Sequence, residues 1–365
     1  MPARFASEPA FRHGEPPRTA VVLCNLGTPE APTPAAVRRY LAEFLADPRV
    51  VEIPRLLWWA ILHGVILRTR PAQSAKKYAS VWTPEGSPLK VWTAKQATLL
   101  RGYLGQRGHA VTVRYAMRYG SPSIASVLDE LKAENTTRVL WLPLYPQYSA
   151  TTTASALDAV ADWSADVRNL PEFRFVNRYP DDPGYIGALA EQVRRHWQAN
   201  GRGERLVLSF HGVPRRTLTL GDPYHCECQK TAWRLGEALQ LRAGELQVTF
   251  QSRLGRAEWL QPYTEPMLVA MARQGVKRVD VMCPGFPADC LETLEEIDHE
   301  ARAAFLAAGG SEFHYVPCLN DRHEWIAALA DLAIRHLQGW PTTEPPDAAA
   351  LAVQRGRALA AGAET

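Results

Sequence analysis

Short apolar segments alternate with longer amphipathic patterns along almost the whole chain, and this alternation is the feature that most constrains its fold. Strands are expected at residues 20–26, 110–115, 138–142, 173–176, 205–210, 246–250, 279–282 and 313–316. Helical patterns lie between them, for example at residues 34–45, 93–104, 183–198, 231–239, 291–308 and 322–337. Such alternation is typical of α/β folds with parallel sheets. Because the strands fall into two groups of about four each, we predict two doubly wound lobes.

The length of the chain agrees with two lobes. Its 365 residues compare with roughly 100–200 residues for a typical domain. We place the first lobe at residues 18–170 and the second at residues 171–319. Residues 1–17 contain proline and polar residues and residues 341–365 are rich in Pro and Ala, so both ends are expected to be mobile.

Composition and motifs exclude several classes of protein. The net charge is only +3, hydrophobic residues make up 46% of the chain, and no basic stripe marks a nucleic-acid binder. Neither GxGxxG after a strand nor the phosphate-binding pattern GxxxxGKS/T occurs, which disfavours a nicotinamide or ATP enzyme. The N-terminal segment lacks the apolar core of a secretory signal, so we expect an intracellular protein with cysteines mostly as thiols.

One apolar segment, LLWWAILHGVIL at residues 56–67, is too short to cross a membrane, because a span needs about 20 apolar residues. Arg55, Arg68 and Arg70 flank it, as they would on a helix whose ends meet lipid headgroups. The segment suits either a buried, ligand-lining helix or a helix at a membrane surface, and one helix can do both.

The strand at residues 205–210 ends on His211 and Gly212, and Pro214 prevents it from running on. Ligands of open α/β sheets bind beyond the carboxyl ends of the strands. His211 is therefore a candidate ligand-binding residue. A hydrogen-bonded histidine that caps a sheet edge is an equal alternative from this stretch alone.

An acidic stripe follows the seventh expected strand. Asp289, Glu292, Glu296 and Glu300 succeed one another at spacings of three and four, opposite the apolar face of the expected helix. A solvent-exposed helix face is enough to explain the stripe. The more specific hypothesis is a row of carboxylates that guides a divalent cation towards a site. Because Glu292 and His211 both follow strand ends in one lobe, we expect them to face one crevice. So few ligands hold a metal loosely, unlike the four ligands of a structural zinc site.

A third candidate is the hydroxyl-rich turn at residues 149–153, which follows the strand at 138–142 by way of Tyr145 and Tyr148. Its hydroxyls can cap the next helix. Capping accounts for only one or two of them, so a large flat ligand with polar edges is an alternative.

Eight segments, met in order along the chain, are similar to segments of the ferrochelatases, in particular those of Gram-negative bacteria. The resemblance runs from about residue 19 to about residue 338. Its segments are NLGTPEAPT from Asn25, GSPLKVWTAKQ from Gly86, YAMRYGSPSI from Tyr115, YPQYSATTTAS from Tyr145, SFHGVPRR from Ser209, GDPYH from Gly221, TFQSRLGRAEWLQPYT from Thr249 and CPGFPADCLETLEEID from Cys283. Any one segment is weak support, but all of them in this order are highly specific.

The resemblance implies insertion of ferrous iron into protoporphyrin IX, which yields protohaem and two protons. It also implies a class II chelatase-like fold, with two Rossmann-like lobes, a porphyrin cleft between them, and a helix at residues 320–338 that returns to the first lobe. His211 and Glu292 match the catalytic pair, a histidine at the porphyrin centre and a carboxylate across from it. Glu296 and Asp289 continue the acidic line, so these residues form the expected metal-binding set.

Further residues match porphyrin-lining positions of the family: Leu26, Arg118, Tyr119, Tyr145, Trp58 and Trp59. The last two fall where the family has a mobile apolar lip over the cleft. In the implied chemistry, a cleft that fits a saddled ring favours the distorted macrocycle. His211 then accepts the pyrrole protons, while the reverse assignment, with His211 as an iron ligand, stays open.

The resemblance also implies cofactors and partners. Fe(II) is expected as a substrate, and no cofactor is expected to be tightly bound. The tail after Trp340 has no cysteine, and the CxC of Cys226 and Cys228 has no second close pair, so an iron–sulfur cluster is not expected. Protoporphyrin IX, Fe(II) and a membrane surface are the expected partners, without nucleic acid. We expect a monomer or homodimer in the cytoplasm, peripheral at the inner membrane.

Two alternatives remain beside this hypothesis. One is a non-catalytic tetrapyrrole or metal carrier that kept the cleft and lost turnover. The other is a chelatase for another metal or another tetrapyrrole such as coproporphyrin. One departure from the family is Cys290, which stands beside Glu292 where some relatives place a histidine.

Overall fold

Two parallel four-stranded sheets form the centre of the molecule, which a computed structural model describes over residues 5–253, 255 and 257–364. The first sheet contains β1 (Arg18–Thr28), β2 (Thr112–Gly120), β3 (Thr136–Pro143) and β4 (Glu172–Phe175), in the order β2-β1-β3-β4. The second contains β5 (Arg205–His211), β6 (Leu246–Gln251), β7 (Arg278–Met282) and β8 (Glu312–Val316), in the order β6-β5-β7-β8. The predicted α/β fold with two doubly wound lobes is confirmed, with every expected strand in place.

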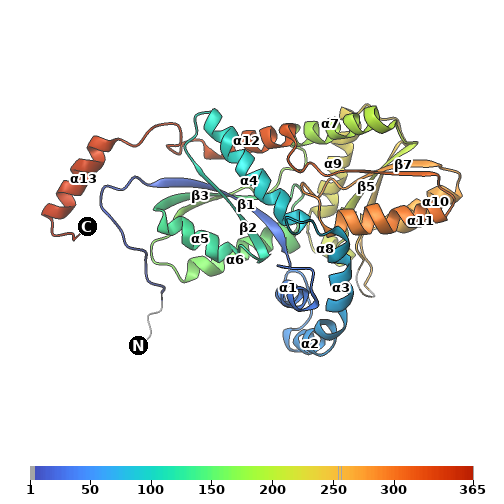
Figure 1. Cartoon of the computed structure of the whole chain (residues 1–365), viewed down its shortest axis with the longest axis horizontal. Helices are drawn as coiled ribbons and strands as arrows, with labels where there is room; N and C mark the ends of the chain where they lie inside the picture. Colours follow the sequence, from blue (N-terminus) through green and yellow to red (C-terminus); the bar gives the residue numbers. More distant parts are fainter. Residues whose placement is uncertain (1–4, 254, 256, 365) are drawn as a thin grey trace.

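Helices flank both sheets (Figure 1). The helices of the first lobe are α1 (Pro34–Ala46), α2 (Arg55–Ile61), η1 (Leu62–Ile66), α3 (Leu67–Val81), α4 (Pro88–Gln106), α5 (Ile124–Ala133), η2 (Ala150–Ala154) and α6 (Ser155–Ala165). The later helices are α7 (Pro183–Asn200), α8 (Arg215–Thr219), α9 (Tyr224–Ala238), α10 (Thr264–Arg273), η3 (Glu292–Ala301), α11 (Arg302–Ala307), α12 (His323–Leu337) and α13 (Ala348–Ala360). Those labelled η are π-helices, whose hydrogen bonds join residues five apart.

Alternate side chains of β1 point to opposite faces of the first sheet, and different helices cover the two faces. Ala20, Val22 and Cys24 pack with apolar residues of α5 and α6, whereas Val21 and Leu23 pack with those of α4. All of these strand residues are fully buried. Burial on both faces explains why the strand reads as a continuous apolar run and not as an alternating one.

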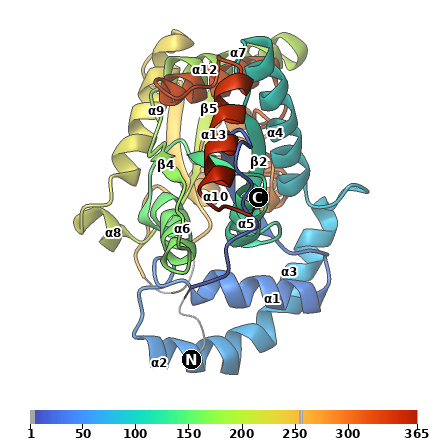
Figure 2. The ribbon, with the colours of Figure 1, turned by 90° about the vertical axis from the view of Figure 1, so that its left-hand side faces the viewer.

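One large core cluster joins the two lobes. Leu23 of β1 and Leu208 of β5 both belong to it, together with buried side chains of α4, α7, α9 and α12. Helix α12 lies between α4 of the first lobe and α7 of the second, and packs against both (Figures 1 and 2). The returning helix expected at residues 320–338 therefore contacts both lobes and not only the first.

Strand β4 corrects the predicted boundary between the lobes. A boundary at residues 170–171 assigns β4 to the second lobe, but β4 pairs in parallel with β3, where Leu140 lies opposite Arg174. The chain therefore crosses to the second lobe only after Phe175. The prediction is wrong here because a short apolar strand contains no sign of which sheet it joins.

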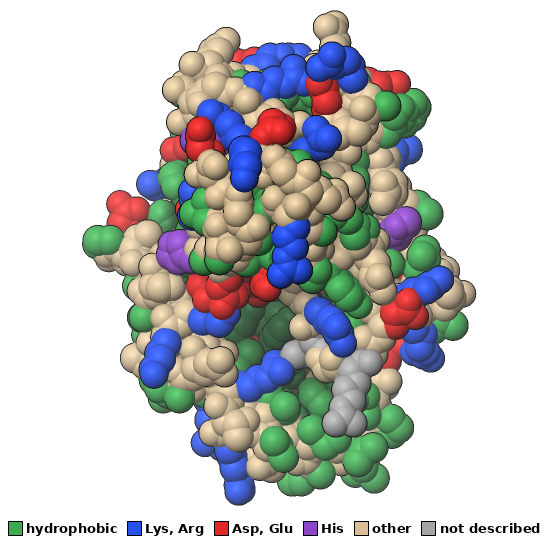
Figure 3. Space-filling model, turned by 90° about the vertical axis from the view of Figure 1, so that its right-hand side faces the viewer, with side chains coloured by type: hydrophobic (Ala, Val, Ile, Leu, Met, Phe, Trp, Pro, Cys, Tyr) green, Lys and Arg blue, Asp and Glu red, His purple; other side chains and the backbone are tan. Residues whose placement is uncertain are grey.

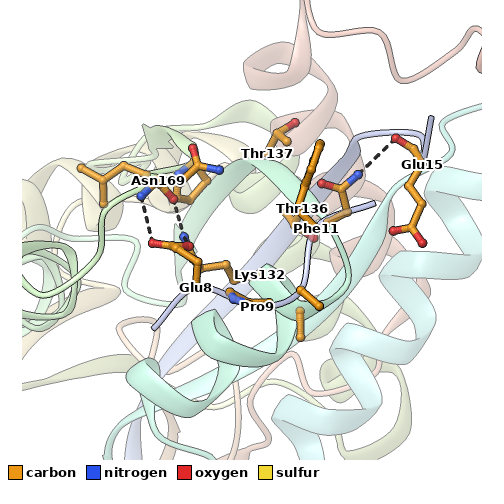
Figure 4. Close-up of a pocket in the computed structure, with 13 residues that line it drawn as sticks. Glu8, Pro9, Phe11, Glu15, Lys132, Thr136, Thr137 and Asn169 are labelled. Carbon is orange, nitrogen blue, oxygen red and sulfur yellow. Dashed lines mark hydrogen bonds and ion pairs between the residues drawn. The ribbon is translucent and has the colours of Figure 1, made fainter. Parts of the chain in front are cut away.

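The N-terminal segment lies against the first lobe. Glu8 accepts hydrogen bonds from the amides of Arg168 and Asn169, and it forms an ion pair with Lys132. Figure 4 shows Glu8 beside Asn169 and Lys132. A pocket of about 280 Å³ lies between this segment and the start of β3. The predicted mobility of residues 1–17 concerns motion and stays a prediction, but the structure shows where the described part docks.

The C-terminal segment contains the helix α13, which passes close to Gly14 of the N-terminal segment. Before this helix, Thr342 is buried, and its carbonyl accepts a hydrogen bond from the amide of Ala110 at 2.6 Å. The tail expected to be mobile at residues 341–365 is thus anchored at its start and helical further on. Its mobility, too, stays a prediction.

Helices α1, α2 and α3 lie together at one end of the molecule, in the lower part of Figures 1 and 2. The apolar segment at residues 56–67 forms α2 and η1, which we call the lip. The lip exposes Leu56, Trp59 and Val65, whereas Trp58 is buried. Within the described ranges, no helix has the length and apolar character that crossing a membrane requires.

Candidate active site

A cleft of about 570 Å³ opens between the two lobes at the carboxyl ends of the strands. The first lobe lines it with residues of α1, α3 and the ends of β1 and β3, and the second lobe with residues that end or follow β5, β6 and β7. Figure 3 looks onto a hollow with hydrophobic side chains on its floor, acidic side chains above it and basic side chains around it. This is the crevice in which open α/β sheets bind their ligands.

His211 is the last residue of β5 and lines the cleft. Its Nδ1 lies 2.6 Å from the Gly212 carbonyl oxygen. Because a carbonyl only accepts, Nδ1 carries the proton and Nε2 keeps its lone pair in the neutral ring. Burial lowers the pKa of His211 and outweighs the opposing effect of the Glu292 carboxylate. The imidazole is therefore neutral at pH 7, with Nε2 able to accept a proton.

Glu292 and Glu296 both lie on η3 and line the same cleft as His211. The sequence predicts one α-helix at residues 291–308, but residues Glu292–Ala301 form a π-helix. The type of helix could not be predicted, because a pattern of apolar residues does not show whether each amide donates to the carbonyl four or five residues before it. π-Helical segments are rare and are frequent at functional sites.

The end of β6 holds Glu296 in place. Gln251 Nε2 donates to the Glu296 carboxylate at 3.2 Å and to the Glu292 carbonyl at 2.8 Å. The Ser252 hydroxyl donates to the same Glu296 oxygen. Burial, with the neighbouring charge of Glu292, raises the pKa of Glu296 to about 7. This carboxyl group therefore gains or loses its proton near neutral pH.

Asp289, the remaining member of the expected metal-binding set, is not part of the cleft lining. It is buried, and its carboxylate accepts hydrogen bonds from Asn320 at 2.6 Å, from Thr293 at 3.1 Å and from the Tyr315 hydroxyl. The acidic line is thus not continued by Asp289 in this structure. Its carboxylate ties the start of η3 to the end of β8.

Four expected porphyrin-lining residues also lie outside the cleft lining. Arg118 and Tyr119 both bind the carboxylate of Asp47, with Arg118 Nη2 at 2.7 Å and the Tyr119 hydroxyl at 2.8 Å. Trp58 is buried, and its Nε1 donates to a carbonyl at the end of α1 at 2.6 Å, whereas Trp59 is exposed on the lip. Arg118, Tyr119 and Trp58 are instead hydrogen-bonded to other residues of the first lobe, and Trp59 faces solvent.

Leu26, on β1, and Tyr145, just after β3, do line the cleft. The hydroxyl of Tyr145 is buried and has no hydrogen-bond partner in the part of the chain that the structure describes. Sequence reasoning missed the aromatic residues Tyr40, Tyr78 and Trp259, which also line the cleft. The two tyrosines look like ordinary core residues of amphipathic helices, but Trp259 lies in a segment similar to the family, which was a usable signal.

Three basic residues reach the cleft: Arg70, Lys77 and Arg253. Lys77 connects the lobes, because its Nζ lies 3.0 Å from Glu295 and 2.7 Å from Glu300 on η3. Arg70 and Arg253 form no ion pair within residues 5–253, 255 and 257–364. They are therefore available to an anionic group at the edge of the cleft.

The cysteines give no sign of a cluster site. All six are free, with Cys226 exposed and Cys228 buried, while Cys290 lines the cleft. No three His, Cys, Asp or Glu side chains are grouped to hold a metal ion among the residues described.

Two lobes with parallel sheets enclose a cleft that His211, Glu292 and Glu296 line at the strand ends, and this arrangement is that of the chelatase fold. The solved structure of SirB from Bacillus subtilis with Fe3+ has this fold, with a TM-score of 0.51 over 88% of this chain and 96% of that chain. The sequences are only 11% identical, so this likeness concerns the fold alone.

The chain belongs to the ferrochelatase family, whose family model matches residues 18–337. The ferrochelatase of Polaromonas sp. is 68% identical over 363 residues, which cover 98% of this chain and 99% of the relative. That of Methylibium petroleiphilum is 68% identical over 361 residues, covering 99% of each chain. That of Dechloromonas aromatica is 58% identical over 363 residues, again 99% of each. The resemblance to ferrochelatases of Gram-negative bacteria is confirmed.

Proposed function

We infer that this member of the ferrochelatase family inserts ferrous iron into protoporphyrin IX, the step that completes haem synthesis. The observation that carries the inference is the placement of His211 and Glu292 in one apolar cleft between the lobes. The family assignment over residues 18–337 supports the same reaction. A carrier would use the cleft but would have no need for a buried neutral imidazole beside a carboxylate, so it is not favoured.

Metal insertion requires two pyrrole N–H protons to leave while the metal arrives. His211 suits the first task, because its Nε2 keeps a lone pair and its low pKa keeps the ring neutral at pH 7. Once protonated, the imidazolium is stabilised by the nearby Glu292 carboxylate. We propose that His211 accepts pyrrole protons. The alternative role of His211 is that of an iron ligand.

Glu292 and Glu296 suit the second task, delivery of Fe(II). Both carboxylates line the cleft on η3, and oxygen ligands of this kind bind divalent cations. The pKa of Glu296, about 7, means that the group is only partly ionised at neutral pH. A partly charged pair holds a divalent ion weakly and releases it, as delivery requires.

The walls and edge of the cleft suit a porphyrin with few carboxylates. Leu41, Phe44 and Phe286 provide apolar walls, and Arg70 and Arg253 are two basic residues that have no carboxylate partner among the described residues. Two cations match the two propionates of protoporphyrin IX. Coproporphyrin has four propionates, and two of them would lie against apolar walls at a desolvation cost.

The test is an anaerobic assay of purified protein with Fe(II) and either protoporphyrin or coproporphyrin, followed by the absorbance of the metallated product. We expect protohaem to form and coproporphyrin to react much more slowly. Binding of protoporphyrin without any metallation indicates a carrier. Preferential metallation of coproporphyrin indicates the other chelatase. The variant Glu30→Gln, which changes an exposed carboxylate paired with Arg39 outside the cleft lining, is a matched control.

We further propose that the lip meets a membrane surface, with the protein in the cytoplasm and peripheral at the inner membrane. Leu56 is 89% exposed and Trp59 is 64% exposed on adjoining turns. Arg55 and Arg68 flank this apolar patch, as expected of a helix that lies among lipid headgroups. Co-sedimentation with anionic vesicles should fall in the double variant Leu56→Ser/Trp59→Ser, and equal sedimentation of both proteins would contradict the proposal.

Fe(II) acts as a substrate, and we propose that no cofactor is tightly bound. Whether the protein is a monomer or a homodimer stays a prediction.

A further inference from the structure

Asp47 is a buried carboxylate that none of the proposed chemistry uses. It caps the C-terminal end of α1 and begins the loop at residues 47–54, which we call the lip loop because it leads into the lip. The side chain is only 3% exposed. Leaving such a charge buried is costly unless strong partners surround it.

The partners of Asp47 come from two other elements of the first lobe. Asp47 Oδ2 accepts hydrogen bonds from Arg118 Nη2 at 2.7 Å and from the Tyr119 hydroxyl at 2.8 Å, both on β2. It also accepts one from the Ser155 hydroxyl at 2.5 Å, at the first residue of α6. Arg118 Nε in turn donates to Ser155. One carboxylate therefore ties the end of α1 to β2 and α6.

The same residue shapes the lip loop. Asp47 Oδ1 accepts from the Arg49 amide at 2.7 Å, and the Asp47 carbonyl accepts from the amides of Val50 and Val51. Val50 and Val51 line the cleft, whereas Asp47 does not. On its other side, Ser155 directly follows η2, whose Thr151 also lines the cleft. Two walls of the cleft are thus held by a single buried group behind them.

We propose that Asp47 is the anchor that positions the lip loop over the porphyrin cleft, and that Arg118 and Tyr119 serve iron insertion as positioning residues through Asp47, without contact to the macrocycle. The proposal rests on the proposed function, because it assigns these residues to porphyrin binding at the same cleft. The class of ligand at stake is the apolar face of a porphyrin, which Val50 and Val51 would contact.

The chemistry of the cluster supports a permanent anchor. Burial opposes ionisation of Asp47, but the hydrogen bonds from Ser155, the Arg49 amide and Tyr119, with the charge of Arg118, lower its pKa below the usual value. The carboxylate is therefore charged throughout the neutral range. The Arg118 guanidinium also stacks 4.5 Å from the centre of the Tyr119 ring, which keeps it directed at Asp47.

A double-mutant cycle separates positioning from direct contact. Asp47→Asn keeps the shape of the side chain and removes its charge, and Arg118→Met removes the cation and keeps most of the volume. Each variant should raise the Kd for protoporphyrin, measured by fluorescence quenching, by about tenfold. If Arg118 acts through Asp47, the Kd of the double variant should also rise by only about tenfold, because the two residues form one unit.

Further readouts exclude a merely structural role. We expect KM for porphyrin to rise in Asp47→Asn while kcat at saturating porphyrin stays close to that of the wild type. Hydrogen exchange should accelerate in the lip loop and the lip and stay unchanged in the second lobe. Tyr119→Phe, which removes only the hydroxyl, is a milder variant if Asp47→Asn folds poorly, and it should raise Kd slightly. Glu30→Gln, in an exposed ion pair of α1, is the control and should change nothing.

Two results would overturn the proposal. The first is an increase of about a hundredfold in the Kd of the double variant, which is the product of two independent effects. Such an increase would mean that Arg118 contacts the porphyrin itself. The second is unchanged exchange of the lip loop in both Asp47→Asn and Tyr119→Phe. Failure of the proposed function has a different signature. If the wild type binds porphyrin but never inserts iron, the variants still differ from it in the Kd for porphyrin and in the hydrogen exchange of the lip loop.

Discussion

Glu296→Gln is the most informative single substitution in the cleft, because it removes a charge whose cost can be read from the structure. Burial and the neighbouring Glu292 raise the pKa of Glu296 from 4.5 to about 7. At about 1.4 kcal/mol for each pH unit, this rise corresponds to a destabilisation of about 3 kcal/mol when the group is ionised in the folded protein. Glutamine has nearly the same shape and never ionises, so the variant avoids this cost.

The sign of the effect follows from proton binding. Between pH 4.5 and about 7 the carboxyl is protonated in the folded chain and ionised in the unfolded chain. The unfolded state then binds fewer protons, so stability falls as the pH rises through this window. The wild type should therefore lose stability relative to Glu296→Gln as the pH rises. The difference between the two free energies of unfolding should change by about 2–3 kcal/mol in favour of the variant from pH 5 to pH 8.

The assay is urea unfolding of both proteins at pH 5, 6, 7 and 8, followed by tryptophan fluorescence. Glu30→Gln is the matched control, because its carboxylate forms an exposed ion pair with Arg39, and such pairs contribute only about 0–1 kcal/mol. A difference between Glu296→Gln and the wild type that is the same at every pH would refute the reasoning. So would a variant that is less stable than the wild type at pH 8.

Three further predictions concern the rest of the site. Gly212→Ala would place a Cβ 2.7 Å from a backbone oxygen of β6, so urea unfolding should show a loss of about 1–3 kcal/mol and iron insertion should slow. Gly187→Ala, in the interior of α7 and with nothing within 4 Å of the added Cβ, should keep its activity and lose no stability. Asp289→Ala leaves buried donors unpaired, so the free energy of unfolding should fall by about 3 kcal/mol, while the Kd for porphyrin, measured by fluorescence titration, should stay unchanged. An increased Kd in a variant of unchanged stability would mean that Asp289 takes part in porphyrin binding. Because Glu296 gains a proton as the pH falls through about 7, the wild-type KM for Fe(II) should rise below that pH, whereas Glu296→Gln should show a high KM that does not vary with pH.

The strands were predictable because their chemistry is local. Residues 20–24 form a continuous apolar run, since one face of β1 packs on α4 and the other on α5 and α6. The pairing of strands is not local, and this is why β4 was assigned to the wrong lobe. Helices α5 and α10, of ten residues each, were not singled out from the sequence.

The meeting of His211 and Glu292 was also predictable from the sequence. Both follow strands of one parallel sheet, and the carboxyl ends of such strands open into the same crevice. Asp289 was not predictable in the same way, because its partners Asn320 and Tyr315 lie 31 and 26 residues further along the chain. Periodicity places a residue on a face of a helix, and it does not show which donors reach that residue.

Family resemblance has a similar limit. It directed attention to Arg118 and Tyr119, but their hydrogen bonds run to Asp47, which is 71 and 72 residues away in sequence. Asp47 itself carries no pattern of its own, since a single acid after a helix gives no sign of the residues that its carboxylate binds. Only the folded chain shows that these residues act together behind the cleft.

The most direct test of the central claim compares wild-type protein with His211→Ala under anaerobic conditions. Both proteins receive Fe(II) and protoporphyrin IX, and the rate of protohaem formation is measured beside the affinity for the porphyrin alone. Because we propose that Nε2 of His211, which keeps its lone pair in the neutral ring, accepts the pyrrole protons, we expect the variant to bind porphyrin as the wild type does and to form no protohaem. Full insertion activity in His211→Ala would contradict it.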